Sequence, residues 1–350
     1  MDYTISITRQ EERKVKESSL APFGTQPTEH MFICEYKKGQ WHDPRIVPFS
    51  DLVLSPFTLC LHYGQTVFEG MKAFTMEDGR VNIFRPLKHY ERFSRSLERL
   101  CMPAVPQGLF IEALHQLIQL DAGWIPNDEE GSLYIRPFMI ASEERIGVKA
   151  ADEYLFMIVC SPAYQYYSKP LKVKVETEFV RAAEGGTGYA KCGGNYGAAL
   201  YPTQLARNEG YDQVIWTDAK THEFIEESGT MNLMFFIDNV LFTPPLSGTI
   251  LDGVTRDSML KLAKEMGIST AEMAISYKEI QVALEAGKRV EAFGAGTAAV
   301  VAPIETIAIN GTHYQCYVGQ DAMMYRLKQA LCDIRKGLRP DTHNWNYILQ

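Results

Sequence analysis

The sequence has 350 residues, 46% of them hydrophobic, which is enough apolar material for a large core and for two domains. The formal net charge is −8 and the Lys and Arg residues are dispersed, which argues against a nucleic-acid partner. The first residues lack the apolar core of a signal peptide, and the longest apolar stretch, Tyr154 to Cys160, is far too short to span a bilayer. We therefore expect a soluble globular protein.

The seven cysteines are scattered along the chain, odd in number, and without any CxxC spacing. This usage suits a reducing compartment and argues against a structural zinc site. We expect a cytoplasmic protein with no metal site and with cysteines that are mostly core thiols.

The first half of the chain mixes helices and strands. Pro86 opens a helical pattern that ends before Pro103, with one apolar face formed by Leu87, Tyr90, Phe93, Leu97 and Leu100. A second helix is predicted from about Gln107 to Gly123, with these residues at helical spacing: Leu109, Phe110, Ala113, Leu114, Leu117 and Ile118. Both helices are expected to pack on a sheet made from the segments 69–75, 132–140 and 154–160.

Composition indicates a domain boundary near the middle of the chain. Between Pro162 and Pro170 the residues turn to Tyr, Ser and Pro, and apolar alternation resumes at Leu171. We expect a small N-terminal α/β domain over residues 1–165, a linker over 166–175, and a larger cofactor-binding domain over 176–350.

The second half also alternates between strands and helices. Strands are predicted at 213–217, 231–236 and 289–293, and helices at about 256–266, 277–285 and 321–335. The segment after Gly194 looks helical, although Pro202 should start, kink or interrupt that helix. The fold class expected is α+β, two domains with mixed or antiparallel sheets.

The most unusual stretch is GGTGYAKCGGNYG, residues 185–197, in which six of thirteen residues are glycine and Lys191 lies near the middle. Glycines permit close backbone approach, so this lysine could be held beside a flat ligand. A mobile surface loop with a solvated lysine explains the glycines equally well. The phosphate-loop pattern GxxxxGK[ST] is not matched.

Another candidate is EESGTMNLMFF, residues 226–236, where a polar turn leads into a buried strand. Glu227 would then lie at the mouth of that strand. A carboxylate there can hold a pyridinium nitrogen protonated, which lets a pyridine ring accept electrons. A solvated turn glutamate is the ordinary alternative.

Two further segments have features that favour an anion. In LDGVTRDSML, residues 251–260, Thr255 fits the N-cap of an amphipathic helix whose free N–H groups attract phosphate. In AFGAGTAAVV, residues 292–301, a strand opens into a Gly turn that contains Thr297. Either feature alone is common in proteins without such a site.

Six motifs follow one another along the chain: HYGQTVFEGMKAF (62–74), LYIRPF (133–138), AKCGGNYGA (190–198), EESGTMN (226–232), LDGVTRDS (251–258) and FGAGTAAVV (293–301). In this order they resemble the branched-chain aminotransferases, members of the class IV aminotransferases with the D-amino-acid aminotransferase-like fold (fold type IV among enzymes that use pyridoxal 5′-phosphate). The resemblance runs from about Phe23 to Val301.

The resemblance assigns residues to pyridoxal phosphate. Lys191 is similar to the catalytic lysine that carries the cofactor as a Schiff base, and Tyr196 to the tyrosine that hydrogen-bonds its phenolic oxygen. Glu227 is similar to the partner of the pyridine nitrogen. The phosphate would be bound by Arg92, Val254, Thr255 and Thr297.

The resemblance also implies a substrate pocket. Tyr63, Thr230 and Ala298 match positions that meet the substrate α-carboxylate. The side-chain pocket would be lined by Phe23, Tyr134, Arg136, Tyr166 and Gln213, with Ile146 and Val148 reaching in from the other subunit of a homodimer.

The activity implied is transamination of L-leucine, L-isoleucine and L-valine with 2-oxoglutarate, as the last step of their biosynthesis or the first of their degradation. Two alternatives stay open: another fold type IV enzyme, such as a D-amino-acid aminotransferase or an aminodeoxychorismate lyase, and a non-catalytic metabolite-binding protein. One departure is that Ala299 and Ala302 stand where animal members carry a redox-active CxxC, so thiol regulation is not expected there.

Overall fold

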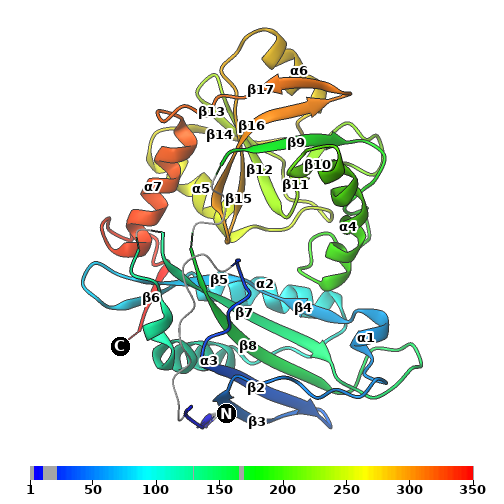
Figure 1. Ribbon diagram of the computed structural model, residues 1–350, viewed down its shortest axis with the longest axis vertical. Coiled ribbons are helices and arrows are strands. Elements are labelled where there is room, and N and C mark those ends of the chain that lie inside the picture. Colours follow the sequence, from blue (N-terminus) through cyan, green and yellow to red (C-terminus); the bar gives the residue numbers. More distant parts are fainter. Residues whose placement is uncertain (1–3, 11–21, 129, 165–168, 350) are drawn as a thin grey trace. The chain divides into compact units, whose positions relative to one another are not determined.

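The computed structural model describes residues 4–10, 22–128, 130–164 and 169–349. Two compact units divide the chain (Figure 1). The first holds Met1–Tyr166, Ala190–Gly194 and Ile334–Gln350, and the second holds Tyr167–Tyr189 and Asn195–Asp333. These units do not follow one cut in the sequence, because both the Lys191 segment and the C-terminal end belong to the first. The expected division into domains at 1–165 and 176–350, joined by a linker over 166–175, stays a prediction.

The first unit is built on a nine-stranded sheet in the order β1-β3-β2-β8-β7-β5-β6-β18, with β4 paired to β7. Its pairings are antiparallel except for β1 with β3. The strands are β1 Ser6–Ile7, β2 His30–Lys37, β3 Gln40–Pro48, β4 Thr66–Phe68, β5 Met71–Thr75, β6 Val81–Phe84, β7 Ser132–Ala141, β8 Tyr154–Ala163 and β18 Asn346–Ile348.

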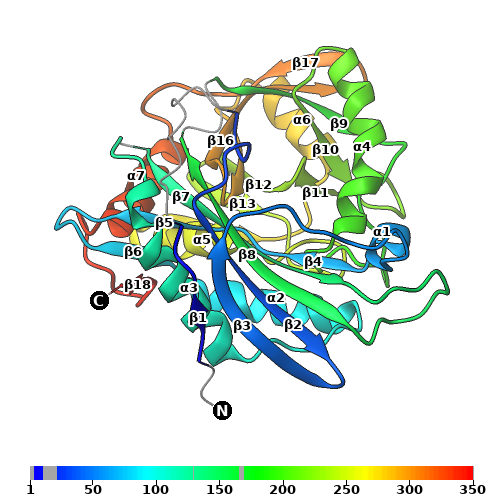
Figure 2. The same ribbon diagram turned by 60° about the horizontal axis from the view of Figure 1, so that its bottom comes forward.

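Helices α2 (Pro86–Arg99) and α3 (Gln107–Leu120) lie on one face of this sheet (Figures 1 and 2). The unit also contains the short helix α1 (Cys60–Tyr63) and the 3-10 turn η1 (Ala122–Trp124). The six residues predicted to be the apolar face of α3 are all buried. The face predicted for α2 is partly wrong, because Leu87 is 50% exposed. The buried face of α2 instead includes the polar residues His89, Arg92 and Ser96, which serve the site described below.

The second unit holds another nine-stranded sheet, in the order β11-β10-β9-β16-β15-β12-β13-β14, with β17 paired to β16. An additional pairing of β11 with β12 closes six of these strands into a ring. Parallel and antiparallel pairings are mixed, as the predicted α+β class allows. The strands are β9 Leu171–Glu176, β10 Gln213–Thr217, β11 Ile225–Ser228, β12 Met231–Ile237, β13 Val240–Thr243, β14 Ser269–Glu272, β15 Glu291–Gly296, β16 Val300–Ile309 and β17 Thr312–Gln315.

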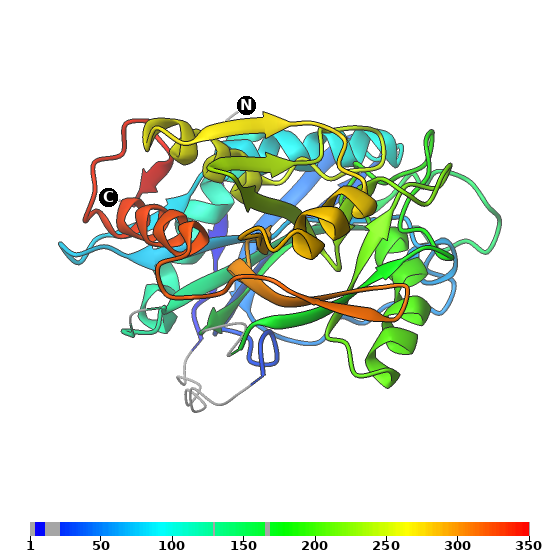
Figure 3. The same ribbon diagram turned by 90° about the horizontal axis from the view of Figure 1, so that it is seen from above.

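Four longer helices occur in the second half of the chain: α4 Gly193–Asn208, α5 Val254–Glu265, α6 Tyr277–Glu285 and α7 Met323–Lys336. Helix α6 has the predicted bounds and begins with a capping box between Ser276 and Glu279. It lies beside the β16–β17 hairpin, where the Gln281 side chain donates to the Tyr314 hydroxyl (Figure 3). Helix α4 continues through Pro202, so the predicted interruption is wrong.

Two local predictions about the second unit need correction. Helix α5 begins at Val254 with Gly253 as its N-cap, so Thr255 is inside the first turn and is not the cap. Glu227 does not lie at the mouth of strand β12. It belongs to a separate buried strand, β11, which the polar letters EES had suggested to be a turn. A search for alternating apolar residues misses such a strand, because its charged side chains are buried.

The loop after β10 is organised by one carboxylate. Asp218 accepts backbone N–H groups from Thr221 at 2.7 Å, Phe224 at 2.8 Å and Glu223 at 3.0 Å. Burial opposes ionisation of Asp218, but these N–H groups outweigh it and hold the pKa of this carboxyl well below its usual value. The loop therefore depends on a charged Asp218.

We predict that Asp218→Asn lowers the free energy of unfolding by about 2 kcal/mol at pH 7, because hydrogen bonds to a charged group are lost. The depressed folded-state pKa stabilises the fold above about pH 4 and loses this effect as the pH falls further, so the difference from the unmodified protein should shrink in acid. Urea unfolding at a series of pH values measures it. Asp238→Asn, which removes an exposed pair with Lys288, is the control and should change little.

Candidate functional site

The segment that carries Lys191 is held firmly inside the first unit. The Lys191 backbone N–H donates to Ser96 Oγ at 2.9 Å, and its carbonyl accepts the Phe68 N–H at 3.0 Å. The residues on either side, Ala190 and Cys192, are 1% and 3% exposed and belong to the core of this unit. The alternative of a mobile surface loop is therefore wrong for Lys191.

Two motif glycines make room for neighbouring side chains. A Cβ at Gly193 would lie 2.5 Å from Thr66 Oγ1, which is a clash with the strand that runs beside the lysine segment. A Cβ at Gly70 would lie 2.1 Å from the Tyr134 hydroxyl. In both places the missing side chain allows close packing within the first unit.

The Phe68 ring lies between two cations. Lys191 Nζ is 4.8 Å from the ring centroid, and the guanidinium carbon of Arg136 is 4.7 Å from it. Arg136 also donates to the Tyr134 hydroxyl at 2.9 Å, and its buried Nε has no hydrogen-bond partner among the described residues. Phe23 packs edge-on against Tyr134 with centroids 4.9 Å apart. The first unit thus brings Phe23, Tyr134 and Arg136 together with Lys191.

Arg92 is buried on α2 and pairs with a carboxylate that the sequence did not single out. Its Nε and one terminal nitrogen donate to the two oxygens of Glu69 at 2.6 and 2.8 Å, and His89 Nδ1 is 2.7 Å from the same carboxylate. Glu69 is fully buried, which disfavours its charge, but Arg92 and His89 outweigh burial and hold the pKa of Glu69 far below its usual value. Burial lowers the pKa of His89, against the pull of Glu69, so this ring is neutral at pH 7.

The remaining first-unit candidates lie near the surface. The Tyr63 hydroxyl, on α1, donates to the Ile146 carbonyl. Ile146 and Val148 are 50% and 79% exposed. Tyr166 lies outside the described residues.

In the second unit, the buried Glu227 carboxylate contacts a backbone N–H group and a guanidinium. Leu251 donates its backbone N–H to Glu227 Oε1 at 2.7 Å, and Arg181 Nε lies 3.3 Å from Oε2. The Arg181 guanidinium is fixed in turn by the carbonyls of Gly188 and Thr249. Each contact favours the ionised carboxylate.

The EESGTMN and LDGVTRDS motifs contact each other within the second unit. Asn232 donates its side-chain amide to the Leu251 carbonyl at 2.9 Å. Gly253 must be glycine because a Cβ would lie 1.8 Å from Asn232 Oδ1. Together these contacts fix the start of α5, where Val254 and Thr255 are buried and no side chain caps the helix. An uncapped helix N-terminus offers N–H groups to an anion.

The FGAGT motif joins this arrangement through the sheet. Ala295 pairs with Asn232 across strands β15 and β12, and Gly294 leaves space for the Met231 side chain. Thr297 and Ala298 follow in the turn to β16 and are partly buried. That turn ends at Val300, whose φ of 63° is a rare conformation for a β-branched residue.

Three other candidates belong to the second unit. Tyr196 lies on α4 and is partly buried. Gln213 begins β10 beside Gly229, where a Cβ would lie 2.5 Å from Gln213 Oε1. Thr230 is exposed in the turn between β11 and β12.

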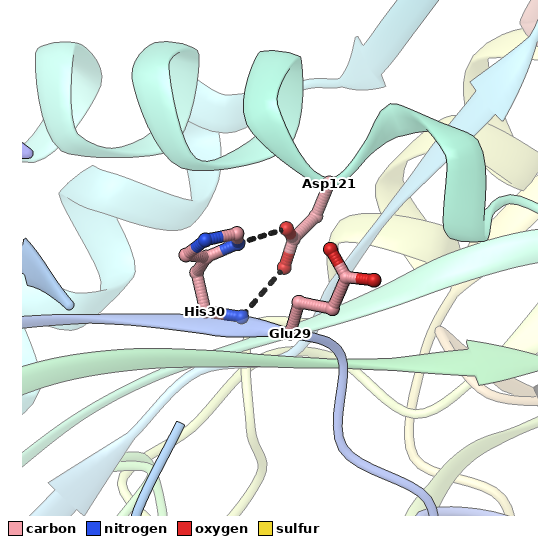
Figure 4. Close-up of side chains that lie close together, drawn as sticks. All are labelled: Glu29, His30 and Asp121. Carbon is pink, nitrogen blue, oxygen red and sulfur yellow. Dashed lines mark hydrogen bonds and ion pairs between the residues drawn. The ribbon is translucent and has the colours of Figure 1, made fainter. Parts of the chain in front are cut away.

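One cluster has the residue types of a metal site. Ligand atoms of Glu29, His30 and Asp121 lie within 4.8 Å of one another (Figure 4). Both ring nitrogens of His30 have protein partners, however: Nδ1 is 2.6 Å from Asp121, and Nε2 accepts the Gln10 N–H at 3.0 Å. Asp121 also accepts the His30 backbone N–H at 3.1 Å. These bonds join the start of β2 to the end of α3, which is a structural role.

The fold is α+β with two sheet-based units, of which the first holds the core-anchored Lys191 and the second holds the buried Glu227 and the start of α5. The family model described as amino-transferase class IV matches residues 66–307. A branched-chain-amino-acid transaminase 1 of Bacillus subtilis is 45% identical over 334 residues, covering 94% of each chain. The Bacillus subtilis branched-chain-amino-acid aminotransferase 2 is 42% identical, covering 97% of this chain and 95% of its own.

The crystal structure of a branched-chain amino acid aminotransferase from Escherichia coli is similar in fold, with a TM-score of 0.75 and 26% identity, covering 92% of this chain and 99% of that one. The chain therefore belongs to the class IV aminotransferase family. The resemblance found in the motifs and the predicted fold class are both confirmed. Among the described residues, no helix has the length and apolar character needed to cross a membrane.

Several important residues escaped sequence reasoning. Phe68 and Glu69 belong to the motif at 62–74. The sequence does not reveal that Phe68 contacts two cations or that Glu69 pairs with a buried arginine. Arg181 lies ten residues before the lysine in a stretch without regular alternation. The only available signal was the helical spacing of His89, Arg92 and Ser96, which place three polar side chains on a buried face.

We predict that Gly193→Ala destabilises the protein by about 2 kcal/mol, because the new methyl group meets Thr66 Oγ1. In a Thr66→Ala background the same change should cost little, since the next Thr66 atom is 3.8 Å away. Gly194→Ala is the matched control, with no atom within 4 Å of its Cβ. Urea unfolding of the four variants tests this, and equal losses from Gly193→Ala in both backgrounds would contradict it.

Proposed function

We propose that the protein transfers the amino group of L-leucine, L-isoleucine and L-valine to 2-oxoglutarate, using pyridoxal 5′-phosphate and giving the branched-chain 2-oxo acids and L-glutamate. The observation that carries this proposal is the anchored Lys191 beside the Phe68 ring and the Arg136 guanidinium. The names of the curated relatives support the same activity. The reaction would end the biosynthesis of these amino acids or begin their degradation.

The donors of the chain fit the cofactor. A buried carboxylate, Glu227, suits a protonated ring nitrogen, and the first turn of α5, which carries the buried Val254 and Thr255, suits a phosphate. Thr297 and Arg92 would complete the phosphate contacts, with Glu69 and His89 fixing the Arg92 guanidinium. Tyr196 would donate a hydrogen bond to the phenolic oxygen.

Bound pyridoxal phosphate supplies an electron sink for the charge that develops when the substrate Cα loses its proton. Lys191 would hold the cofactor through its amine, and the same amine would take the proton from the substrate Cα and return it to the cofactor C4′. Glu227 keeps the ring nitrogen protonated during this step. Tyr63, Thr230 and Ala298 would hold the α-carboxylate and so orient the Cα–H bond.

The same pocket must accept an isobutyl group and a propionate in alternate half-reactions. Phe23, Tyr134 and the Phe68 ring give an apolar wall, and Tyr166 and Gln213 would extend the lining. Arg136 has an unpaired Nε among the described residues, so it can bind the distal carboxylate of glutamate without a competing protein anion.

A homodimer is part of the proposal. An apolar surface is formed by Val53, Phe57, Leu61, Ile146 and Val148, which are 50–98% exposed. Backbone contacts between Thr58 and Glu144 and from Arg145 to Phe57 join its two segments. Such a patch favours association, and Ile146 and Val148 would then line the partner's pocket. Light scattering of the purified protein tests this, and a monomer at micromolar concentration contradicts it.

We also propose a cytoplasmic location. All seven cysteines are free thiols, as suits a reducing compartment. Fractionation with a tagged chain tests this.

We predict that Lys191→Ala abolishes both transamination and the visible absorbance of the lysine-bound cofactor, while Lys174→Ala, which removes a surface pair with Glu209, changes neither. A steady-state panel with 2-oxoglutarate should show turnover of L-leucine, L-isoleucine and L-valine. Turnover of only D-alanine or aminodeoxychorismate would establish one of the fold type IV alternatives instead. A protein that stays colourless with added cofactor would reject the enzyme.

We predict that Arg136→Gln lowers kcat/KM for L-glutamate and 2-oxoglutarate about 100-fold, because a charged hydrogen bond of about 2–3 kcal/mol is lost. L-Leucine, which has no distal charge, should lose less than about fivefold. Single-turnover measurement of each half-reaction separates the two effects. Arg80→Gln, an exposed arginine paired with Asp78, is the control. An equal loss for both substrates would show that Arg136 acts only on the structure of the pocket.

A further inference from the structure

A second buried carboxyl group lies next to Glu227 and has no part in the chemistry above. Glu226 is 7% exposed and Glu227 is 3% exposed, and they are consecutive residues of β11. Glu226 Oε1 is 2.5 Å from Thr249 Oγ1, whereas its buried Oε2 has no hydrogen-bond partner among the described residues. Nothing in the proposed catalytic cycle requires a carboxyl group at this position.

One guanidinium serves both carboxyl groups. Arg181 contacts Glu227 directly and donates to the carbonyl of Thr249, the residue whose hydroxyl meets Glu226. The charged groups that act on Glu226 are Arg181, which favours its ionisation, and Glu227 and Asp218, which oppose it. Two ionised carboxyl groups outnumber the Arg181 charge that they share, so ionising both costs more than ionising one.

The polar contacts decide which one is charged. Glu227 accepts a backbone N–H on one oxygen, and the Arg181 guanidinium lies 3.3 Å from the other as an ion pair. Glu226 has one hydroxyl partner, and an ionised Glu226 would leave a buried, charged oxygen without a donor. Burial therefore raises the pKa of Glu226, with a further contribution from Glu227.

We propose that Glu226 is a positioning residue for Glu227: it stays protonated at neutral pH and so leaves the charge of Arg181 to the neighbouring carboxylate. The buried group of three is then neutral overall, and Glu227 alone carries the negative charge that meets the ring nitrogen. This inference rests on the proposed function for the role of Glu227, but not for the protonation of Glu226.

The structure also provides a route by which Glu226 can exchange its proton. Ser247 Oγ lies 2.9 Å from Thr249 Oγ1, and Ser247 is exposed. A proton given by Glu226 to Thr249 Oγ1 displaces the Thr249 hydroxyl proton to Ser247 Oγ, whose own proton passes to water. Both hydroxyls are restored, and Glu226 gains one negative charge. The group can thus titrate without unfolding of β11.

The first test detects the proton directly. In full-length protein at pH 7, the infrared difference spectrum of the unmodified chain minus Glu226→Gln should contain the C=O band of a protonated carboxylic acid. This band should disappear as the pH rises. Carboxylate bands alone in that difference spectrum would overturn the proposal.

The second test uses stability. Because the folded-state pKa of Glu226 is raised above its ordinary value of 4.5, its stabilising effect is complete below that pH and is lost as the pH rises through the folded value. Glutamine has no proton to lose. The folding constant of Glu226→Gln relative to the unmodified chain should therefore increase by about tenfold per pH unit across this window. A constant or falling ratio contradicts the proposal.

Glu227→Gln is the matched control from the next position of the same strand. It removes a carboxylate that accepts a backbone N–H and pairs with Arg181, so its relative folding constant should stay level above pH 4.5, where that of Glu226→Gln rises. If Glu226→Gln does not fold, Thr249→Val replaces it. That variant removes the hydroxyl partner of Glu226, which raises its folded-state pKa further, so the fall of stability with pH should extend to higher pH than in the unmodified chain.

Comparison with and without pyridoxal phosphate separates this inference from the proposed function. A protonated ring nitrogen at Glu227 adds positive charge and should move the disappearance of the Glu226 band to lower pH. A band that is present but does not move with cofactor overturns the link to Glu227 while the protonation of Glu226 stands. A missing band overturns the protonation whatever the enzyme's activity.

Discussion

Both peptide groups of Lys191 are hydrogen-bonded within the first unit, the N–H to a hydroxyl on α2 and the carbonyl to the backbone of β4. These bonds use only the backbone of Lys191, so its side chain has no part in fixing the segment. Ser96 also donates to the Arg92 carbonyl at 2.9 Å, which joins the lysine segment to the turn of α2 that carries the buried arginine. The position of the reactive amine therefore depends on packing and backbone bonds that are complete before any ligand binds.

Each unit buries a carboxylate against a guanidinium, Glu69 with Arg92 in the first and Glu227 with Arg181 in the second. Burying such pairs gains little stability, because desolvation offsets most of the attraction. Their value lies in geometry, since a paired and hydrogen-bonded charge has few alternative orientations. The two pairs differ in the assigned partner: in the first the arginine would face the ligand, and in the second the carboxylate would.

The sequence predicted those features that depend on apolar periodicity. The buried face of α3 and the bounds of α6 follow from spacing and capping alone. It failed where polar groups are buried, as in β11 and on the inner face of α2, because a pattern that equates polar with exposed misassigns them. The six motifs located Lys191, Glu227 and the α5 start, but the partners Glu69, Arg181 and Asn232 became visible only through contacts between distant segments. Such contacts have no local periodicity for a sequence to reveal.

Several glycines of the six motifs have a structural role that the sequence does not reveal. The glycines of residues 185–197 are predicted to permit close approach of a ligand, whereas Gly193 accommodates the Thr66 side chain, as Gly70 and Gly253 accommodate those of Tyr134 and Asn232. These side chains in turn orient a pocket hydroxyl, the lysine strand and the helix N-terminus. The glycines therefore specify the scaffold that holds the reacting groups. Arg136 in turn contacts the Phe68 ring and the same Tyr134 hydroxyl that Gly70 accommodates.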